Sequence, residues 1–276
     1  MYHFVHVSDI HFSPGAYEKR PAFRPFLEDV ETQIKNLSGE IFLILSGDVA
    51  GSGAHQNDFI NFLDQIDPIL TSAGIPKTHR VCVPGNHDIS KEVVGRRLVD
   101  HEAVIKAELN ESIFNEYLIS PGQVFDEKFE NYLEFEKSFA SFGVGSSRVG
   151  GSGHSFSDDL GIFCANSAFF SSGGIEINKV PVSDMGRLSV GTRNLANWLN
   201  QSKHRTRIFV CHHPTNWLTE WSSREIKNSL LSFDLAFFGH EHRQDAADEH
   251  RASGRTLVLN APALLTDKRH PMGYSL

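Results

Sequence analysis

The chain has 276 residues, of which 40% are hydrophobic, and its formal net charge is −8. This length and composition suit one large globular domain with an ample core. The negative charge argues against a generally basic nucleic-acid binder, because phosphate neutralisation needs clustered lysine and arginine, although a local basic groove is still possible. No apolar run approaches the roughly 20 residues of a membrane span. The N-terminus has no basic segment followed by an apolar one, so we expect a soluble, cytoplasmic protein without membrane contacts.

Short apolar runs that end in turn-forming or polar residues predict strands. Helical periodicity appears between several of these runs, at residues 25–37, 58–74 and 194–201. Strands that alternate with helices predict an α/β fold in layers, with sheets covered on both faces. The predicted strands occupy residues 2–7, 41–47, 79–85, 160–167, 207–213, 235–240 and 255–262.

Residues 90–142 interrupt this alternation, because they contain helical patterns and no convincing strand. We expect a helical insertion that packs on the core and could cap a cleft. Its aromatic stripe indicates packing, with substrate stacking as the alternative. The Gly- and Ser-rich residues 143–156 predict a flexible loop. The chain stops in what resembles the start of a strand, which suggests a longer parent protein or a trimmed one.

The three cysteines, Cys82, Cys164 and Cys211, lie in separate apolar runs. This placement predicts buried free thiols and neither a disulfide framework nor a cysteine-rich metal site. A metal ion would therefore need histidine, aspartate and asparagine ligands.

Such ligand types follow five of the predicted strands. In layered α/β folds, ligands bind at the carboxyl ends of strands, so side chains that are distant in sequence can converge there. Residues i and i+2 of an extended segment point to the same side, which would let Asp9 and His11, or His240 and His242, face one ion. Glycines at 47, 85 and 239 allow sharp turns and close approaches. The five segments are Asp9-Ile10-His11, Gly47-Asp48, Gly85-Asn86-His87-Asp88, His212-His213 and Gly239-His240-Glu241-His242.

In this order the five motifs resemble the calcineurin-like metallophosphoesterase superfamily, and they run from residue 9 to residue 242. The resemblance implies an α/β four-layer αββα sandwich of two mixed β-sheets, with a dinuclear metal site at the carboxyl ends of the strands. It also implies that residues 1–276 form one catalytic domain, in which residues 90–142 are a cap-like insertion.

The resemblance assigns roles to individual residues. Asp9, His11 and His242 would hold one divalent ion. Asn86, His212 and His240 would hold the second, and Asp48 would bridge the two. Such a mixed nitrogen and oxygen shell suits Mn, Fe, Zn, Co or Ni without selecting one of them. A hydroxide that bridges the two ions would attack phosphorus in line.

Several other residues lie beside these candidate ligands. His87 would protonate the leaving group, and Asp88 would orient it. His213, directly after His212, is either a substrate contact or the true ligand in place of His212. His55 either reaches the cleft or flanks a helix on the surface.

The motif details favour one class of ester. The segments "GDVAGSG" and "GNHD" lack the acidic and arginine positions that mark protein phosphatases in this superfamily. We therefore expect a phosphodiesterase that acts on a small substrate, such as a nucleotide. The alternatives are a nuclease module of a larger assembly, similar to Mre11 or SbcD, a phosphomonoesterase, and a non-catalytic metal-binding module. A nuclease would need a basic cleft, for which "HRTR" and "TDKRHP" are the local candidates. The oligomeric state is left open, and an additional domain or partner protein is compatible with the sequence.

Overall fold

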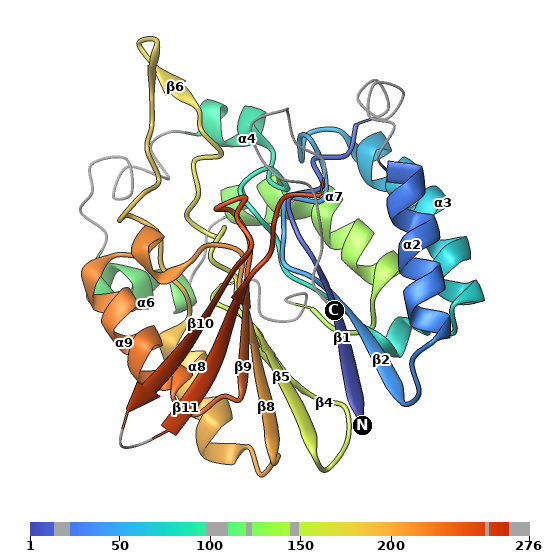
Figure 1. The fold of residues 1–276 in the computed structure, drawn as a ribbon. Helices are drawn as coiled ribbons and strands as arrows, with labels where there is room; N and C mark the ends of the chain where they lie inside the picture. Colours follow the sequence, from blue (N-terminus) through green and yellow to red (C-terminus); the bar gives the residue numbers. More distant parts are fainter. Residues whose placement is uncertain (14–22, 98–109, 120–122, 144–148, 252–253, 265–276) are drawn as a thin grey trace.

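The computed structural model describes residues 1–13, 23–97, 110–119, 123–143, 149–251 and 254–264. Two β-sheets lie face to face in the middle of the molecule, and helices cover the outer face of each sheet (Figure 1). The expected αββα layering is therefore confirmed.

The first sheet contains three strands in the order β1-β2-β3. These are β1 (Tyr2–Val7), β2 (Glu40–Leu45) and β3 (Arg80–Cys82). Both pairings are parallel, so all three strands deliver their carboxyl ends to the same edge. Helices α2 (Phe23–Lys35), α3 (Gln56–Ser72) and α7 (Gln123–Phe139) lie on the side of this sheet that faces away from the second sheet (Figure 1).

The second sheet contains six strands in the order β10-β11-β9-β8-β5-β4. The four central strands, β11 (Gly254–Asn260), β9 (Leu235–Phe238), β8 (Thr206–Val210) and β5 (Leu160–Cys164), pair in parallel. The edge strands β10 (Asp245–Arg251) and β4 (Ser152–Ser155) are antiparallel to their neighbours, which makes this sheet mixed. Helices α6 (Glu111–Ile119), α8 (Thr192–Gln201) and α9 (Glu220–Leu230) lie on its outer side (Figure 1).

Aromatic side chains fill the space between the layers. Phe4 and His6 of β1 contact Phe237 of β9 across the two sheets, with ring centroids 6.0 and 4.7 Å apart. On the outer face of the second sheet, Phe163 packs against Trp198 of α8 at 5.7 Å. Burial of side chains of this size is the main source of stability for such a layered core.

All seven predicted strands are confirmed, with their ends shifted by a few residues. The described residues contain four further strands: the edge strands β4 and β10, and the short β6 (Glu176–Ile177) and β7 (Val180–Pro181), which form a hairpin. The three cysteines are buried and free, as predicted. Within the described residues, no helix is both long enough and apolar enough to cross a membrane.

The segment expected to be a flexible loop, residues 143–156, contains β4, so that prediction is wrong for residues 152–155. A Cβ atom at Gly153 would lie 2.0 Å from the indole of Trp198. Close packing of α8 on the sheet therefore requires glycine at position 153, and this glycine does not indicate a flexible loop. Residues 144–148 lie outside the described residues.

The segment expected to be a helical insertion contains α4 (Lys91–Arg96), α6 and α7. Its aromatic stripe packs inside the helical layer, as Phe135 of α7 stacks on Phe59 of α3 at 5.2 Å. Asn131 of α7 also donates a hydrogen bond of 2.8 Å to the carbonyl oxygen of Gly53. Helix α7 thus belongs to the layer that supports the first sheet. Residues 98–109 and 120–122 lie outside the described residues, so a capping role for this segment is still only a prediction.

Candidate metal centre

The loops that follow five strands meet at one edge of the two sheets. Backbone hydrogen bonds join these loops to one another: Asp9 N to Gly47 O at 3.1 Å, His11 N to Asp48 O at 2.9 Å, and Gly239 N to His212 O at 2.9 Å. The carboxyl ends of parallel strands share an edge, so the fold itself brings the five sequence motifs together.

Asp9, His11 and His242 form the first group of candidate ligands. Asp9 Oδ1 lies 3.1 Å from His242 Nε2 and 3.9 Å from His11 Nε2. This oxygen is buried and makes no hydrogen bond of acceptable geometry. Asp9 Oδ2, in contrast, accepts a hydrogen bond of 2.9 Å from the backbone N–H of His240. An orphaned buried carboxylate oxygen with two imidazoles around it fits a position made for a cation.

Asp48 lies between this group and the second one. Its Oδ2 atom is 3.9 Å from His11 Nε2 on one side and 3.3 Å from His212 Nε2 on the other. Its Oδ1 atom accepts a hydrogen bond of 2.7 Å from the backbone N–H of His87. A carboxylate in this position could serve two adjacent ions, and the bridging role that the family resemblance implies for Asp48 stays a prediction.

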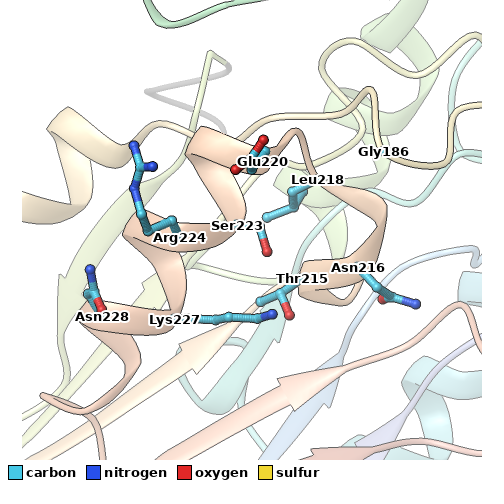
Figure 2. Close-up of a pocket in the computed structure, with 9 residues that line it drawn as sticks. All are labelled: Gly186, Thr215, Asn216, Leu218, Glu220, Ser223, Arg224, Lys227 and Asn228. Carbon is cyan, nitrogen blue, oxygen red and sulfur yellow. The ribbon is translucent and has the colours of Figure 1, made fainter.

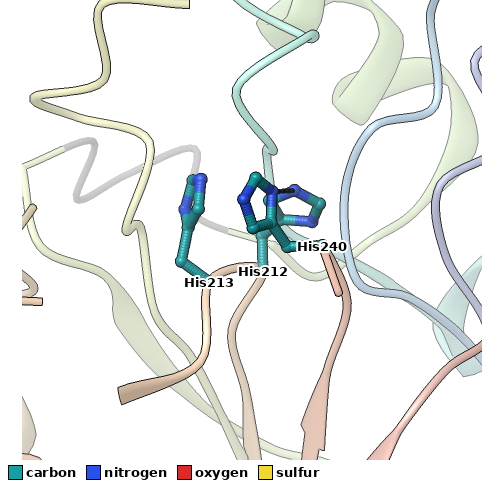
Figure 3. A group of neighbouring side chains, drawn as sticks. All are labelled: His212, His213 and His240. Atoms are coloured by element: carbon teal, nitrogen blue, oxygen red, sulfur yellow. Dashed lines mark hydrogen bonds between the residues drawn. The ribbon is translucent and has the colours of Figure 1, made fainter. Parts of the chain in front are cut away.

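His212, His213 and His240 form the second group (Figure 3). His240 Nδ1 is 3.3 Å from His212 Nε2. The Nδ1 atom of His212 hydrogen bonds to the Ser46 carbonyl oxygen at 2.7 Å, so the Nε2 atom is the one that faces Asp48 and His240.

His213 is also part of this centre. Its Nδ1 lies 2.8 Å from Ser167 Oγ, and its Nε2 lies 3.2 Å from Asn86 Oδ1. Both neighbouring histidines therefore direct Nε2 at the centre, and the assignment of His212 as the ligand stays a prediction.

The backbone at these positions is bent in an unusual way. Among the described residues, seven other than glycine have a positive φ, and five of them are candidate ligands: Asp9, His11, Asp48, His240 and His242. The pairs Asp9/His11 and His240/His242 therefore do not converge as alternate residues of an extended strand, which corrects the reasoning from the sequence. They converge because the chain curls immediately after each strand. Strained conformations of this kind cost on the order of 1–3 kcal/mol each and cluster at functional sites.

His87 lies beside the first group, with its ring centroid 4.5 Å from that of His11. Asp88 does not orient it, contrary to the prediction. The carboxylate of Asp88 is buried and accepts hydrogen bonds from the backbone N–H groups of Ala50, at 3.0 Å, and Gly85, at 2.9 Å. The nearest partner of His87 Nδ1 is the carbonyl oxygen of Gly51, at 3.3 Å. Asp88 thus fastens together the loops that carry Asp48 and Asn86.

His55 is not brought to the centre. It is exposed at the N-terminus of α3, where its backbone bonds to Ser52 and Asp58 and its charge influences Asp58. This placement matches the alternative interpretation, a surface histidine that flanks a helix.

Comparison with known protein families matches this arrangement. The model of the calcineurin-like phosphoesterase family covers residues 2–244, which includes all five motifs. The chain belongs to this family.

Three known proteins resemble parts of this chain in sequence or in structure. A Bacillus subtilis (strain 168) protein described as uncharacterized metallophosphoesterase-like protein YydB is 32% identical over 97 residues, which are 35% of this chain and 20% of that protein. The 5'-nucleotidase precursor from Thermus thermophilus superimposes on 99% of this chain with 13% identity and a TM-score of 0.48. The Thermus thermophilus sulfate thiohydrolase SoxB superimposes on 95% of it with 11% identity and a TM-score of 0.45. This chain spans about half the length of these two structures, 53% and 52%.

The electrostatics of the centre fit cations. Burial would raise the pKa of Asp9, but His242 and His212 lower it to about 2. For Asp48, burial is again opposed by the nearby histidines, and the pKa falls well below its usual value. Burial lowers the pKa of His11 and of His240 to about 4, so both imidazoles are neutral near pH 7 and can donate a lone pair. Burial opposes protonation of His212, but Asp48 and Asp9 raise its pKa to about 9, and the hydrogen bond to Asp9 raises the pKa of His242. A cation that binds at these two imidazoles would displace their protons. Carboxylates and imidazoles together are the donor set of a mixed N/O metal site.

Sequence reasoning missed the residues that support the ligands. Ser46 and Ser167 hold the rings of His212 and His213. Glu241 accepts a hydrogen bond of 2.7 Å from the indole N–H of Trp217, which lies on η3 (Thr215–Trp217). Local sequence patterns could not reveal these contacts, because each contact joins segments that are tens to hundreds of residues apart.

Proposed function

We propose that this protein is a dimetal phosphoesterase that prefers phosphodiesters, with a small substrate such as a nucleotide. The observation that carries the proposal is the convergence of candidate ligands from five strand ends into two adjacent groups, with Asp48 Oδ2 near one histidine of each. Such an arrangement could hold two cations close together, as hydrolytic dimetal sites require.

The proposed roles follow from the positions of the side chains. The first ion would be held by Asp9, His11 and His242, and the second by Asn86, His240 and His212, with Asp48 between them. Two divalent ions supply a nucleophile at neutral pH and neutralise charge on the phosphoryl group. His87 lies at the edge of the first group, where its imidazole can give a proton to the leaving oxygen.

The charge around the centre supports a diester. In the described part of the chain, the ion-pair partners of Asp9 and Asp48 are all histidines. A phosphate monoester is a dianion near neutral pH, and its extra negative charge is best matched by an additional arginine or lysine. A diester carries one negative charge, which two divalent ions can neutralise without such help.

The position of the basic residues supports a small substrate. The segment "HRTR", at residues 204–207, lies at the amino end of β8, the opposite end from the candidate ligands. It therefore does not line the centre, which corrects one expectation for a nuclease. The other basic candidate, at residues 266–271, lies outside the described residues.

Hydrolysis of bis-p-nitrophenyl phosphate and p-nitrophenyl phosphate, each with Mn²⁺ and with EDTA, tests the proposal. We expect faster cleavage of the diester and loss of cleavage in EDTA. Faster cleavage of the monoester would move the assignment to a phosphomonoesterase, and degradation of single-stranded DNA would move it to a nuclease. Bound metal without turnover of any of these substrates would contradict an enzymatic role and favour a binding module.

A further inference from the structure

Glu241 occupies the position between His240 and His242 at which the family motif leaves the residue free. Its Oε1 atom accepts two hydrogen bonds from η3, one from Trp217 Nε1 at 2.7 Å and one from Asn216 Nδ2 at 3.3 Å. Because η3 begins one residue after His212-His213-Pro214, Glu241 ties the loop after β9 to the loop after β8. These two loops carry four of the histidines of the centre.

Trp217 connects this tie to a candidate ligand. Its ring stands almost perpendicular to the imidazole of His240, with an interplanar angle of 81° and centroids 4.0 Å apart. The indole is held at one end by Glu241 and therefore forms a fixed wall against that imidazole. A T-shaped contact of this kind fixes the plane of the ring as well as its position.

Helix α9 lies against the outer side of η3. A pocket of about 540 Å³ lies there, with Thr215 and Asn216 on one side and Arg224 and Lys227 of α9 across from them (Figure 2). Trp217 is held by the carboxylate of Glu241, by a ring contact with His213 at 6.0 Å, and by backbone bonds from Gly186 and Leu188 to its carbonyl oxygen.

We propose that Glu241 and Trp217 are positioning residues for the second metal ion, an inference that rests on the proposed function. The carboxylate fixes the indole, and the indole fixes the imidazole plane of His240 so that its lone pair points at the ion. Loss of an outer partner of a metal ligand typically weakens metal affinity by about 10- to 100-fold.

Stepwise Mn²⁺ titration by calorimetry, on the full chain stripped of metal, measures this effect without any need for turnover. Trp217→Phe keeps an aromatic ring and every charge but removes the N–H that binds Glu241. We expect it to weaken one of two Mn²⁺ sites by about 10-fold or more and to leave the other unchanged. Glu241→Ala should weaken the same site at least as much, and Glu241→Gln, which keeps an acceptor oxygen, should restore most of the affinity.

Glu225→Ala is the matched control, because Glu225 is an exposed carboxylate on α9 whose ion-pair partner is Arg224. It should leave both sites unchanged. Thermal unfolding of the metal-free variants shows whether each one folds. If Glu241→Ala does not fold, Trp217→Phe and Glu241→Gln still test the proposal.

Equal affinities in the wild type and in Trp217→Phe would overturn the inference. So would an equal loss at both sites, since a general weakening of the centre is not positioning of one ligand. Mn²⁺ binding at two sites without hydrolysis would refute the proposed function alone. Binding of fewer than two ions by the wild type would refute both.

Discussion

Gly85 offers the sharpest test of how the centre is assembled, because the structure leaves no room for a side chain there. A Cβ atom added at Gly85 would lie 2.1 Å from Asp48 Oδ1 and 2.5 Å from the backbone nitrogen of Asp48. Neither neighbour is the end of a flexible side chain, since the Asp48 carboxylate is buried and accepts a hydrogen bond from His87 N. In Gly85→Ala, the carboxylate or its loop must therefore move.

The size of the effect follows from these distances. Ordinary contacts of a Cβ atom begin at about 3.4 Å, so the Asp48 carboxylate must shift by more than 1 Å. Overpacking of this kind costs roughly 1–3 kcal/mol of stability. Misplacement of a reacting group by about 1 Å can lower the rate about 100-fold. We expect Gly85→Ala to fold with reduced stability, to lose at least one Mn²⁺ site, and to hydrolyse bis-p-nitrophenyl phosphate about 100-fold more slowly.

Gly95→Ala is the matched control, because a Cβ atom at Gly95 in α4 meets nothing within 4 Å. That substitution should keep both metal ions and full activity, and should stabilise the protein by up to about 1 kcal/mol, since alanine is the better helix former. Calorimetry, thermal unfolding and the diester assay would be run on both variants. Wild-type metal binding and activity in Gly85→Ala would refute the reasoning.

Three further predictions concern other parts of the molecule. His87→Asn should lower kcat by about 10²- to 10⁴-fold and leave two Mn²⁺ bound by calorimetry, because the proposal assigns His87 to the leaving oxygen and not to an ion. Loss of one Mn²⁺ would instead make His87 a ligand, since it lies close enough to His11 and Asp48 to hold an ion with them. Asp48→Asn should weaken both Mn²⁺ sites together, since the same carboxylate faces both groups. Burial lowers the pKa of Lys128 to about 7 from 10.5, against the opposing effect of Asp184. The unfolded chain therefore binds more protons between these pH values, and the free energy of unfolding rises as the pH rises from about 7. Lys128→Met should flatten that rise in chemical denaturation from pH 6 to 9, and an unchanged slope would contradict it.

Much of the fold could be predicted from the sequence because its central strands are buried on both faces. Such strands are continuous apolar runs that end in turn-forming residues, and each of the seven predicted runs forms a strand. The polar residues after these runs then indicate one edge of the layered sheets. The convergence of Asp9, Asp48 and His212 follows from this topology alone.

Elements without an apolar pattern could not be found in this way. Strand β10 has the sequence DAADEHR and lies at the edge of its sheet, where pairing with β11 and not burial makes it a strand. Helix α9 buries only Ser222, Ile226 and Leu230, too few to give a clear helical period. Tertiary contacts decide both structures, and local sequence does not record such contacts.

The supporting residues of the centre were hidden for a related reason. Asp88 follows His87 in the chain, which suggested a direct contact between them. The two carboxylate oxygens instead bond the backbone at Ala50 and Gly85. Adjacent side chains in a tight loop point in different directions, so proximity in sequence was a poor guide to the hydrogen-bond partner.

The residues with a positive φ suggest why the ligand motifs consist of aspartate and histidine separated by one residue. Alternate side chains of an extended strand share one face and are about 6.6 Å apart along the strand. Positive φ at Asp9 and His11 turns the chain out of this extended conformation, and the hydrogen bond from His11 N to Asp48 O holds the turn. Aspartate and histidine are among the residues that tolerate this conformation most readily. The same residue types therefore serve as the ligand atoms and as the turn that aims them, so a substitution that kept only one of these properties would disrupt the centre.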